Sequence, residues 1–380
     1  MSQQTSIKRI DNLALIRAIA ISSVVIYHTV LMVAGEMTGS ETFFSMTKYT
    51  QQGQYGVDLF FVLSGFLIGR LYWEELKALG HVNIINFILR RILRTFPPYF
   101  IALFLAFVPV WMNRHQAFDW GYLFFIQNYY DRIPFFLVSW SLCVEEHFYI
   151  VLPILITCIQ RFKPRVVLLI LLSLSFLPAL LRMLLIDYHV HHDNGYYITA
   201  THFRFEGLIL GVAASHIFTY FPNVSRQLGG RSFNILLVAF SVLLVPILTM
   251  VPLGFTYYIG LSAIAFVFGL LVLSFSRSRP ILLSKNPLVA LLANSSYSIY
   301  LSHALVIHFV LLIAHKLHIP PFFTWLAMLG SIIAVGYLFY ILIEKRSLAL
   351  RDTLVPRFNH LKSESEVRSP KSEVQRLEQI

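Results

Sequence analysis

The chain alternates between long apolar stretches and short polar connections. A helix that crosses a bilayer needs about 20 mostly apolar residues, within a range of about 17 to 25, and the chain contains ten such stretches. They cover residues 13–34, 56–73, 96–112, 137–159, 166–186, 199–220, 233–250, 256–275, 295–314 and 323–343. The pattern predicts an all-α, polytopic integral membrane protein with about ten transmembrane helices.

Basic residues are distributed unevenly among the connections. The loops on the side of the N-terminus contain thirteen, namely Arg70, Lys77, Arg90, Arg91, Arg94, Arg161, Lys163, Arg165, Arg226, Arg231, Arg277, Arg279 and Lys285. The opposite loops contain four, Lys48, Arg114, Arg132 and Lys316. Cytoplasmic loops carry the excess of Lys and Arg. We therefore predict a multi-pass protein of the cytoplasmic (inner) membrane with both termini in the cytoplasm.

Composition supports the same class. Of the 380 residues, 57% are hydrophobic and only 13% are charged, whereas a soluble domain carries about 25% charged residues. The net charge of +11 is spread over the loops, which argues against a nucleic-acid-binding face. Cys143 and Cys158 both lie in one apolar stretch and predict neither a disulfide framework nor a zinc site. The N-terminal apolar run has no signal-peptide cleavage pattern and is expected to be retained.

The domain organisation follows from the same pattern. We expect one membrane domain over residues 1–350 and no additional soluble domain, because no polar segment is long enough to fold alone. No internal repeat is found in the sequence. Residues 351–380 are polar and of mixed charge, which predicts a flexible cytoplasmic tail.

The first apolar stretch carries two ionisable residues, Arg17 and His28. They are three helical turns apart, so they project from one face at depths that differ by roughly 16 Å. Ionisable groups inside a membrane are costly and usually face a polar cavity. The pattern predicts that this helix forms one wall of an internal site.

The second stretch begins GVDLFFVLSGFLIG and places Asp58 at a depth similar to that of His28. Asp58 either caps the helix or orients and charges a nearby histidine. Gly65 and Gly69 are spaced for close helix packing, and Gly207 and Gly211 repeat this spacing in the sixth stretch.

Residues 83–100 predict an amphipathic helix on the cytoplasmic surface, ended by Pro97 and Pro98. Its arginines are suited to lipid headgroups. Arg91 and Arg94, one turn apart, are also suited to holding phosphates by paired hydrogen bonds.

The fourth stretch contains Glu145 and Glu146, followed by His147. Neighbours on a helix point about 100° apart, so the two carboxylates cannot face the same partner. One is expected to form a structural ion pair, for which Arg204 is the natural counter-ion, while the other faces the cavity. Buried carboxylates of this kind are functional candidates by default.

Two histidine groups are weaker candidates. His189, His191, His192 and Asp193 imitate a metal site, but such close spacing rarely converges on one ion. We expect no metal. His303 lies one turn beyond Tyr300, and a satisfied buried histidine is favoured there over a catalytic one.

Taken together, these segments resemble the acyltransferase-3 family of polytopic membrane acyltransferases, which includes bacterial O-antigen and exopolysaccharide O-acetyltransferases. The resemblance covers residues 10–345 in order. It rests on Arg17 and His28, GVDLFFVLSGFLIG at 56–69, Arg91 and Arg94, WSLCVEEHFYIVLP at 140–153 and YSIYLSH at 297–303.

The resemblance implies transfer of an acyl group, usually acetyl, from cytoplasmic acyl-CoA to a sugar hydroxyl. It implies that His28 is the catalytic base and that Arg17, Arg91 and Arg94 handle the donor. The chain departs from the family where His147 stands in place of the frequent glutamine. It departs again at residues 302–305, which lack the family's Trp-His-x-Pro pattern.

We therefore predict an O-acyltransferase with acetyl-CoA as donor and a cell-surface carbohydrate or glycolipid as acceptor. Its expected catalytic residues are His28, Asp58, Glu145 and Glu146, and its donor-binding residues are Arg17, Arg91 and Arg94. In this scheme Asp58 or one of the glutamates orients His28. The alternative is a proton-coupled transporter or glycolipid flippase without acyl transfer. The acyltransferase consumes acetyl-CoA, whereas the transporter or flippase does not.

Overall fold

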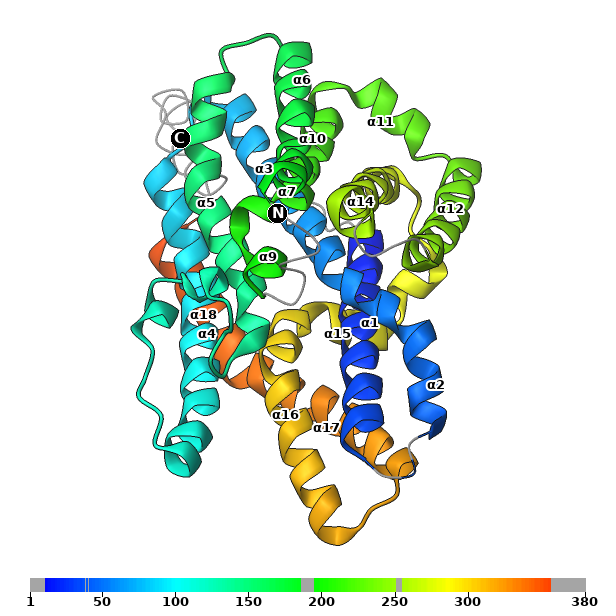
Figure 1. Ribbon diagram of the computed structural model, residues 1–380. Helices are drawn as coiled ribbons and strands as arrows, with labels where there is room; N and C mark the ends of the chain where they lie inside the picture. The colour runs from blue at the N-terminus through cyan, green and yellow to red at the C-terminus, as the bar shows by residue number, and fades with distance from the viewer. Residues whose placement is uncertain (1–10, 38, 40, 186–194, 251–254, 357–380) are drawn as a thin grey trace, which may run out of the picture.

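The structure is a computed structural model that describes residues 11–37, 39, 41–185, 195–250 and 255–356 (Figure 1). The described residues form helices and contain no strand. The α-helices are α1 (Asp11–Glu36), α2 (Glu41–Thr50), α3 (Gly56–Leu79), α4 (Ile84–Arg114), α5 (Trp140–Ile159), α6 (Pro164–Ser175), α7 (Leu177–Leu185), α9 (Gly195–Thr199), α10 (Glu206–Tyr220), α11 (Pro222–Leu228), α12 (Arg231–Met250), α14 (Leu261–Arg277), α15 (Pro287–Asn294), α16 (Ser296–Leu317), α17 (Pro321–Phe339) and α18 (Lys345–Leu354).

Shorter helical turns join these elements. Two are π-helical, η6 (Thr256–Gly260) before α14 and η8 (Tyr340–Glu344) between α17 and α18. The others are 3₁₀ turns, η1 (Gln51–Tyr55), η2 (Trp120–Leu123), η3 (Gln127–Tyr129), η4 (Leu137–Ser139), η5 (Thr201–Phe203) and η7 (Leu282–Lys285).

The predicted membrane architecture is confirmed. Within the described residues, eight helical stretches are long and apolar enough to cross a membrane, and α10 with α11, bent by 113°, would make a ninth. The remaining predicted stretch, residues 233–250, lies in the 20-residue helix α12. Within the described residues, each of the ten predicted stretches thus contains a helix, as an all-α polytopic protein requires, and the stretch 199–220 starts with a 3₁₀ turn and irregular residues before α10.

The predicted end of the amphipathic helix at Pro97 and Pro98 is wrong. Both prolines lie inside α4, which continues for 31 residues from the arginine-rich segment into the membrane span. A proline removes one helical hydrogen bond but keeps a helical φ, and tertiary packing supports the helix here. Pro98 is buried, and the hydroxyl of Tyr297 on α16 donates a hydrogen bond to the backbone oxygen of Thr95 at 2.9 Å.

The expected close packing at the glycines is confirmed between α3 and α10, which lie side by side in the upper half of Figure 1. A Cβ atom on Gly65 would lie 2.0 Å from the backbone oxygen of Leu208, and one on Gly211 would lie 2.2 Å from that of Val62. Only glycine permits backbones to approach this closely.

Helix α1 is held among several helices. The Asn12 side chain donates hydrogen bonds to the backbone oxygens of Phe275, Ser278 and Arg279 and accepts one from the Ile281 backbone N–H. These contacts attach the start of α1 to the end of α14. Apolar side chains of α1 then pack against α3 and α15 in the core, which fixes where Arg17 and His28 can point.

Helical structure extends past residue 350, the predicted boundary of the flexible tail. Helix α18 ends at Leu354, and Asp352 forms a 2.6 Å ion pair with Arg90 of α4. Residues 357–380 of the predicted tail lie outside the described residues.

Candidate active site

A cavity of about 80 Å³ lies between α1, α3, α4, α5 and α16. Its polar lining residues come from all five helices and are Arg17, Ser64, Arg91, Arg94, Thr95, Ser141, Glu145, Tyr149, Ser296, Tyr297 and Tyr300. One water needs about 10–15 Å³ on a comparable measure. The cavity therefore has room for a small acyl group or several waters.

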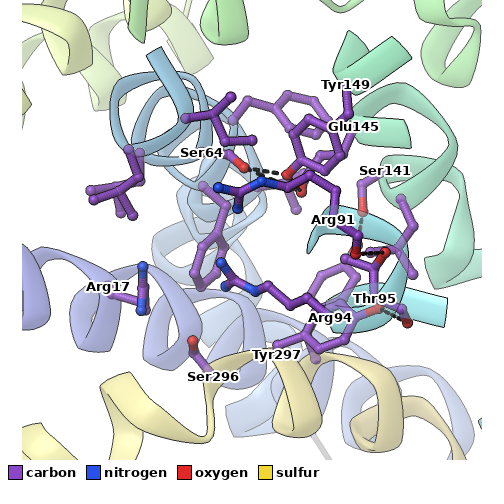
Figure 2. Close-up of a pocket in the computed structure, with 18 residues that line it drawn as sticks. Arg17, Ser64, Arg91, Arg94, Thr95, Ser141, Glu145, Tyr149, Ser296 and Tyr297 are labelled. Atoms are coloured by element: carbon purple, nitrogen blue, oxygen red, sulfur yellow. Dashed lines mark hydrogen bonds between the residues drawn. The ribbon is translucent and has the colours of Figure 1, made fainter. Parts of the chain in front are cut away.

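Two arginines reach this cavity from α4. Figure 2 shows the guanidinium groups of Arg91 and Arg94 in the same space, with Arg17 entering from α1. Arg91 is buried, and its guanidinium lies over the ring of Phe87 at 5.8 Å. Neither Arg91 nor Arg94 forms an ion pair with a carboxylate of the described residues. Buried charges normally have a counter-ion, so this arrangement suits an anionic ligand.

Glu145 is the carboxylate that faces the cavity. Its Oε2 accepts hydrogen bonds from the hydroxyls of Tyr149 at 2.5 Å and Ser64 at 3.3 Å (Figure 2). Glu146 is buried but does not line the cavity. The two neighbours thus have different surroundings, as the 100° offset along α5 requires.

His28 lies outside the cavity lining, against His303 of α16. The two imidazole ring centroids are 5.1 Å apart. Nδ1 of His28 donates to the backbone oxygen of Val24 at 3.0 Å, and Nδ1 of His303 donates to that of Tyr300 at 2.6 Å. Tyr300 connects this pair to the cavity, because it lines the cavity and its ring lies 5.5 Å from that of His303.

Comparison with known proteins identifies the family to which this chain belongs. A family model described as an acyltransferase domain matches residues 10–341. The chain belongs to the acyltransferase-3 family. No solved structure matches it.

Two relatives from Staphylococcus aureus illustrate the similarity within the family. A predicted O-acetyltransferase of strain MRSA252 is 25% identical over 382 residues, which cover 90% of this chain and 59% of the relative. The O-acetyltransferase OatA of strain NCTC 8325 is 26% identical over 323 residues, which cover 78% of this chain and 50% of OatA. The chain thus spans between half and three fifths of the length of these relatives.

The predicted partner of Arg204 is wrong. Arg204 forms a 2.8 Å ion pair with Asp58, rather than with a glutamate of α5, and its guanidinium lies over the Trp140 ring at 4.8 Å. Asp58 is in the first turn of α3, and Arg204 lies two residues before α10 begins at Glu206. The packing of α3 against α10 places Arg204 beside Asp58, and on α5 Arg204 contacts the Trp140 ring and not a glutamate.

This ion pair also changes the expected role of Asp58. Asp58 is buried and forms its ion pair with Arg204, whereas Nδ1 of His28 donates a hydrogen bond to the backbone carbonyl of Val24 in its own helix. No carboxylate of the described residues is hydrogen-bonded to His28. The geometry therefore places Asp58 in an α3–α10 ion pair, next to a second buried pair at 2.8 Å between Arg182 and Glu206.

Sequence reasoning missed several polar residues of the site. Ser64, Tyr149 and Ser141 line the cavity, but serine and tyrosine in an apolar stretch give no distinct signal. Glu344 is buried in the π-helical η8 and accepts a 2.5 Å hydrogen bond from Ser298 of α16. It was detectable as the acidic residue at the end of the last apolar stretch, and π-helical turns are frequent at functional sites.

Within the described part of the chain, no group of three or more His, Cys, Asp or Glu residues is placed to hold an ion. The cluster of His189, His191, His192 and Asp193 considered from the sequence lies outside the described residues.

Proposed function

We propose that the protein is a membrane-embedded O-acyltransferase of the cytoplasmic membrane. It would move an acyl group, acetyl in our expectation, from cytoplasmic acyl-CoA to a hydroxyl of a cell-surface carbohydrate or glycolipid. The observation that carries the proposal is a cavity with two arginines, Arg91 and Arg94, that have no carboxylate partner in the described residues. Family membership and relatives named as O-acetyltransferases support the reaction class.

The arginines would bind the phosphates of the donor. Guanidinium groups match phosphate oxygens with paired hydrogen bonds, and Arg17 adds a third positive charge from α1. At about 80 Å³ the cavity cannot enclose a whole coenzyme A. The nucleotide would therefore remain on the cytoplasmic side, with the extended pantetheine arm directing the thioester inward.

His28 would act as the general base. The acceptor oxygen attacks the thioester carbonyl carbon, the C–S bond breaks, and the sulfur leaves with the electron pair while Nε2 of His28 takes the hydroxyl proton. This role is supported by the tautomer, because the Nδ1 proton of His28 is held by the Val24 carbonyl and Nε2 carries the lone pair. Glu145, hydrogen-bonded to Tyr149 and Ser64, would orient groups within the cavity. Glu146 and Asp58, which do not line the cavity, would contribute by stabilising the helices that carry it.

The test is transfer of labelled acetyl from acetyl-CoA to envelope glycans in membranes that contain the protein. Loss of a general base lowers the rate by roughly 10²- to 10⁴-fold, so His28→Ala should reduce transfer to this extent. His308→Ala, at an exposed histidine of α16, is the matched control and should retain wild-type activity. Transfer near the wild-type rate in His28→Ala would contradict the base assignment. No acetyl-CoA consumption by the wild-type protein would contradict the reaction class and favour transport.

A further inference from the structure

The contact between His28 and His303 joins two helices that are far apart in the sequence. Their rings are tilted by 47° with centroids 5.1 Å apart. His28 is half-buried, whereas His303 is fully buried. The His28 side chain therefore keeps some exposed surface, whereas that of His303 keeps none.

Hydrogen bonding sets the same tautomer on both rings. Each Nδ1 donates its proton to a backbone carbonyl of its own helix, of Val24 for His28 and of Tyr300 for His303. In a neutral imidazole the other nitrogen then carries a lone pair. Nε2 of His303 is buried and has no hydrogen-bond partner in the described residues. A buried acceptor without a partner is costly, and this cost needs a reason.

Of the two described rings in contact with His303, those of His28 and Tyr300, only that of His28 can become a cation. The other rings against the two histidines are those of Tyr27 and Tyr300. Neither phenol offers its proton to Nε2 of His303, and the hydroxyl of Tyr300 instead donates to the backbone oxygen of Val138. No carboxylate in the described structure is hydrogen-bonded to either imidazole. Two imidazoles this close hold one proton more easily than two, because like charges repel.

We propose that His303 is the positioning residue of His28, a neutral imidazole whose Nε2 lone pair stabilises the imidazolium that forms when His28 takes the acceptor's proton. The inference rests on the proposed acyl transfer. Because Nδ1 of His28 donates to the Val24 carbonyl and its Nε2 takes the acceptor's proton, His303 acts through the ring contact at 5.1 Å and not through a hydrogen bond. The proton moves from the hydroxyl to His28, and His303 neither gains nor loses a proton. His303 also fixes the orientation of the His28 ring by contact.

Three substitutions separate this role from simple packing. His303→Phe keeps an aromatic ring but has no lone pair. His303→Gln places an amide near the position of Nε2, and His303→Asn places one near Nδ1. We expect His303→Phe and His303→Asn to lower kcat by roughly 10- to 30-fold, because the attraction between a charge and a neutral ring is weaker than a hydrogen bond to a charged group. Gln should stay within about 5-fold of wild type, and KM for acetyl-CoA should be nearly unchanged in all three.

The control is His216→Phe. His216 is also a buried histidine, but it lies in α10, and its ring contacts Trp73 rather than His28. It should leave kcat unchanged. Protection by acetyl-CoA against thermal unfolding reports that each variant is folded and binds the donor. If His303→Phe does not fold, His303→Asn serves as the variant without a lone pair at the position of Nε2.

Two outcomes would overturn the role of His303. One is full activity in Phe or Asn, and the other is a larger loss in Gln than in Phe, which is the result expected of packing alone. Neither would affect the proposed function, which fails only if the wild-type protein transfers no acetyl group.

Discussion

Three guanidinium groups and one hydrogen-bonded carboxylate share a cavity that is too small for a whole donor. Arg91 and Arg94 extend from α4, Arg17 from α1, and Glu145 from α5. Charges at membrane depth persist where they have a function or a partner. The absence of an ion pair at Arg91 and Arg94 in the described structure therefore favours a ligand with phosphate groups.

This view predicts a specific effect of Arg94→Gln. Hydrogen bonds to charged groups contribute about 1.5–3 kcal/mol, so KM for acetyl-CoA should rise by roughly 10- to 100-fold, while KM for the acceptor should change little. Steady-state kinetics with each substrate varied in turn would measure both. The matched control is Arg114→Gln, at the exposed opposite end of the same helix. An equal change in both KM values would show that Arg94 has a general structural role.

At the scale of elements, the site depends on how closely α3 and α10 approach. Their crossing places Asp58 beside Arg204 and sets the position of Ser64 on the wall of the cavity. Gly65 lies one residue from Ser64 and faces the backbone of α10. A change in helix spacing here should therefore alter both stability and the geometry of the cavity.

Gly65→Ala is expected to destabilise the protein, because the new Cβ would lie 2.0 Å from the backbone oxygen of Leu208. Overpacking of this kind costs about 1–3 kcal/mol, which would lower the Tm of the detergent-solubilised protein by several degrees. Gly330→Ala is the control, because its Cβ would meet no atom within 4 Å and should leave the Tm almost unchanged. Equal Tm values for the two variants would argue against close α3–α10 contact.

At the scale of the whole molecule, the order of the helices and the distribution of basic loops give an orientation. Helices α1 and α16 would run from the cytoplasm outward, and α3 and α5 inward. The arginine-rich start of α4 then lies on the side where acyl-CoA is found. An acyl group that crosses between these helices could reach an acceptor on the outer side.

Cysteine labelling tests this orientation. In a protein with Cys143→Ser and Cys158→Ser, a cysteine in place of Arg161 should react with a membrane-impermeant maleimide only when the cytoplasmic face is accessible. A cysteine in place of Lys316 should react from outside in intact cells. Both positions are exposed in the structure. Labelling of both positions from the same side would contradict the predicted topology.

The pattern of apolar stretches by itself determined that the chain is an all-helical, multi-spanning membrane protein, because a bilayer admits only segments that satisfy their own backbone hydrogen bonds. Short motifs also singled out Arg17, Arg91, Arg94 and Glu145, which line one cavity in the structure. Only the tertiary structure decided which side chains meet. Contacts between helices distant in the sequence leave no local signal, so the pairing of Arg204 with Asp58 and of His28 with His303 could not be predicted.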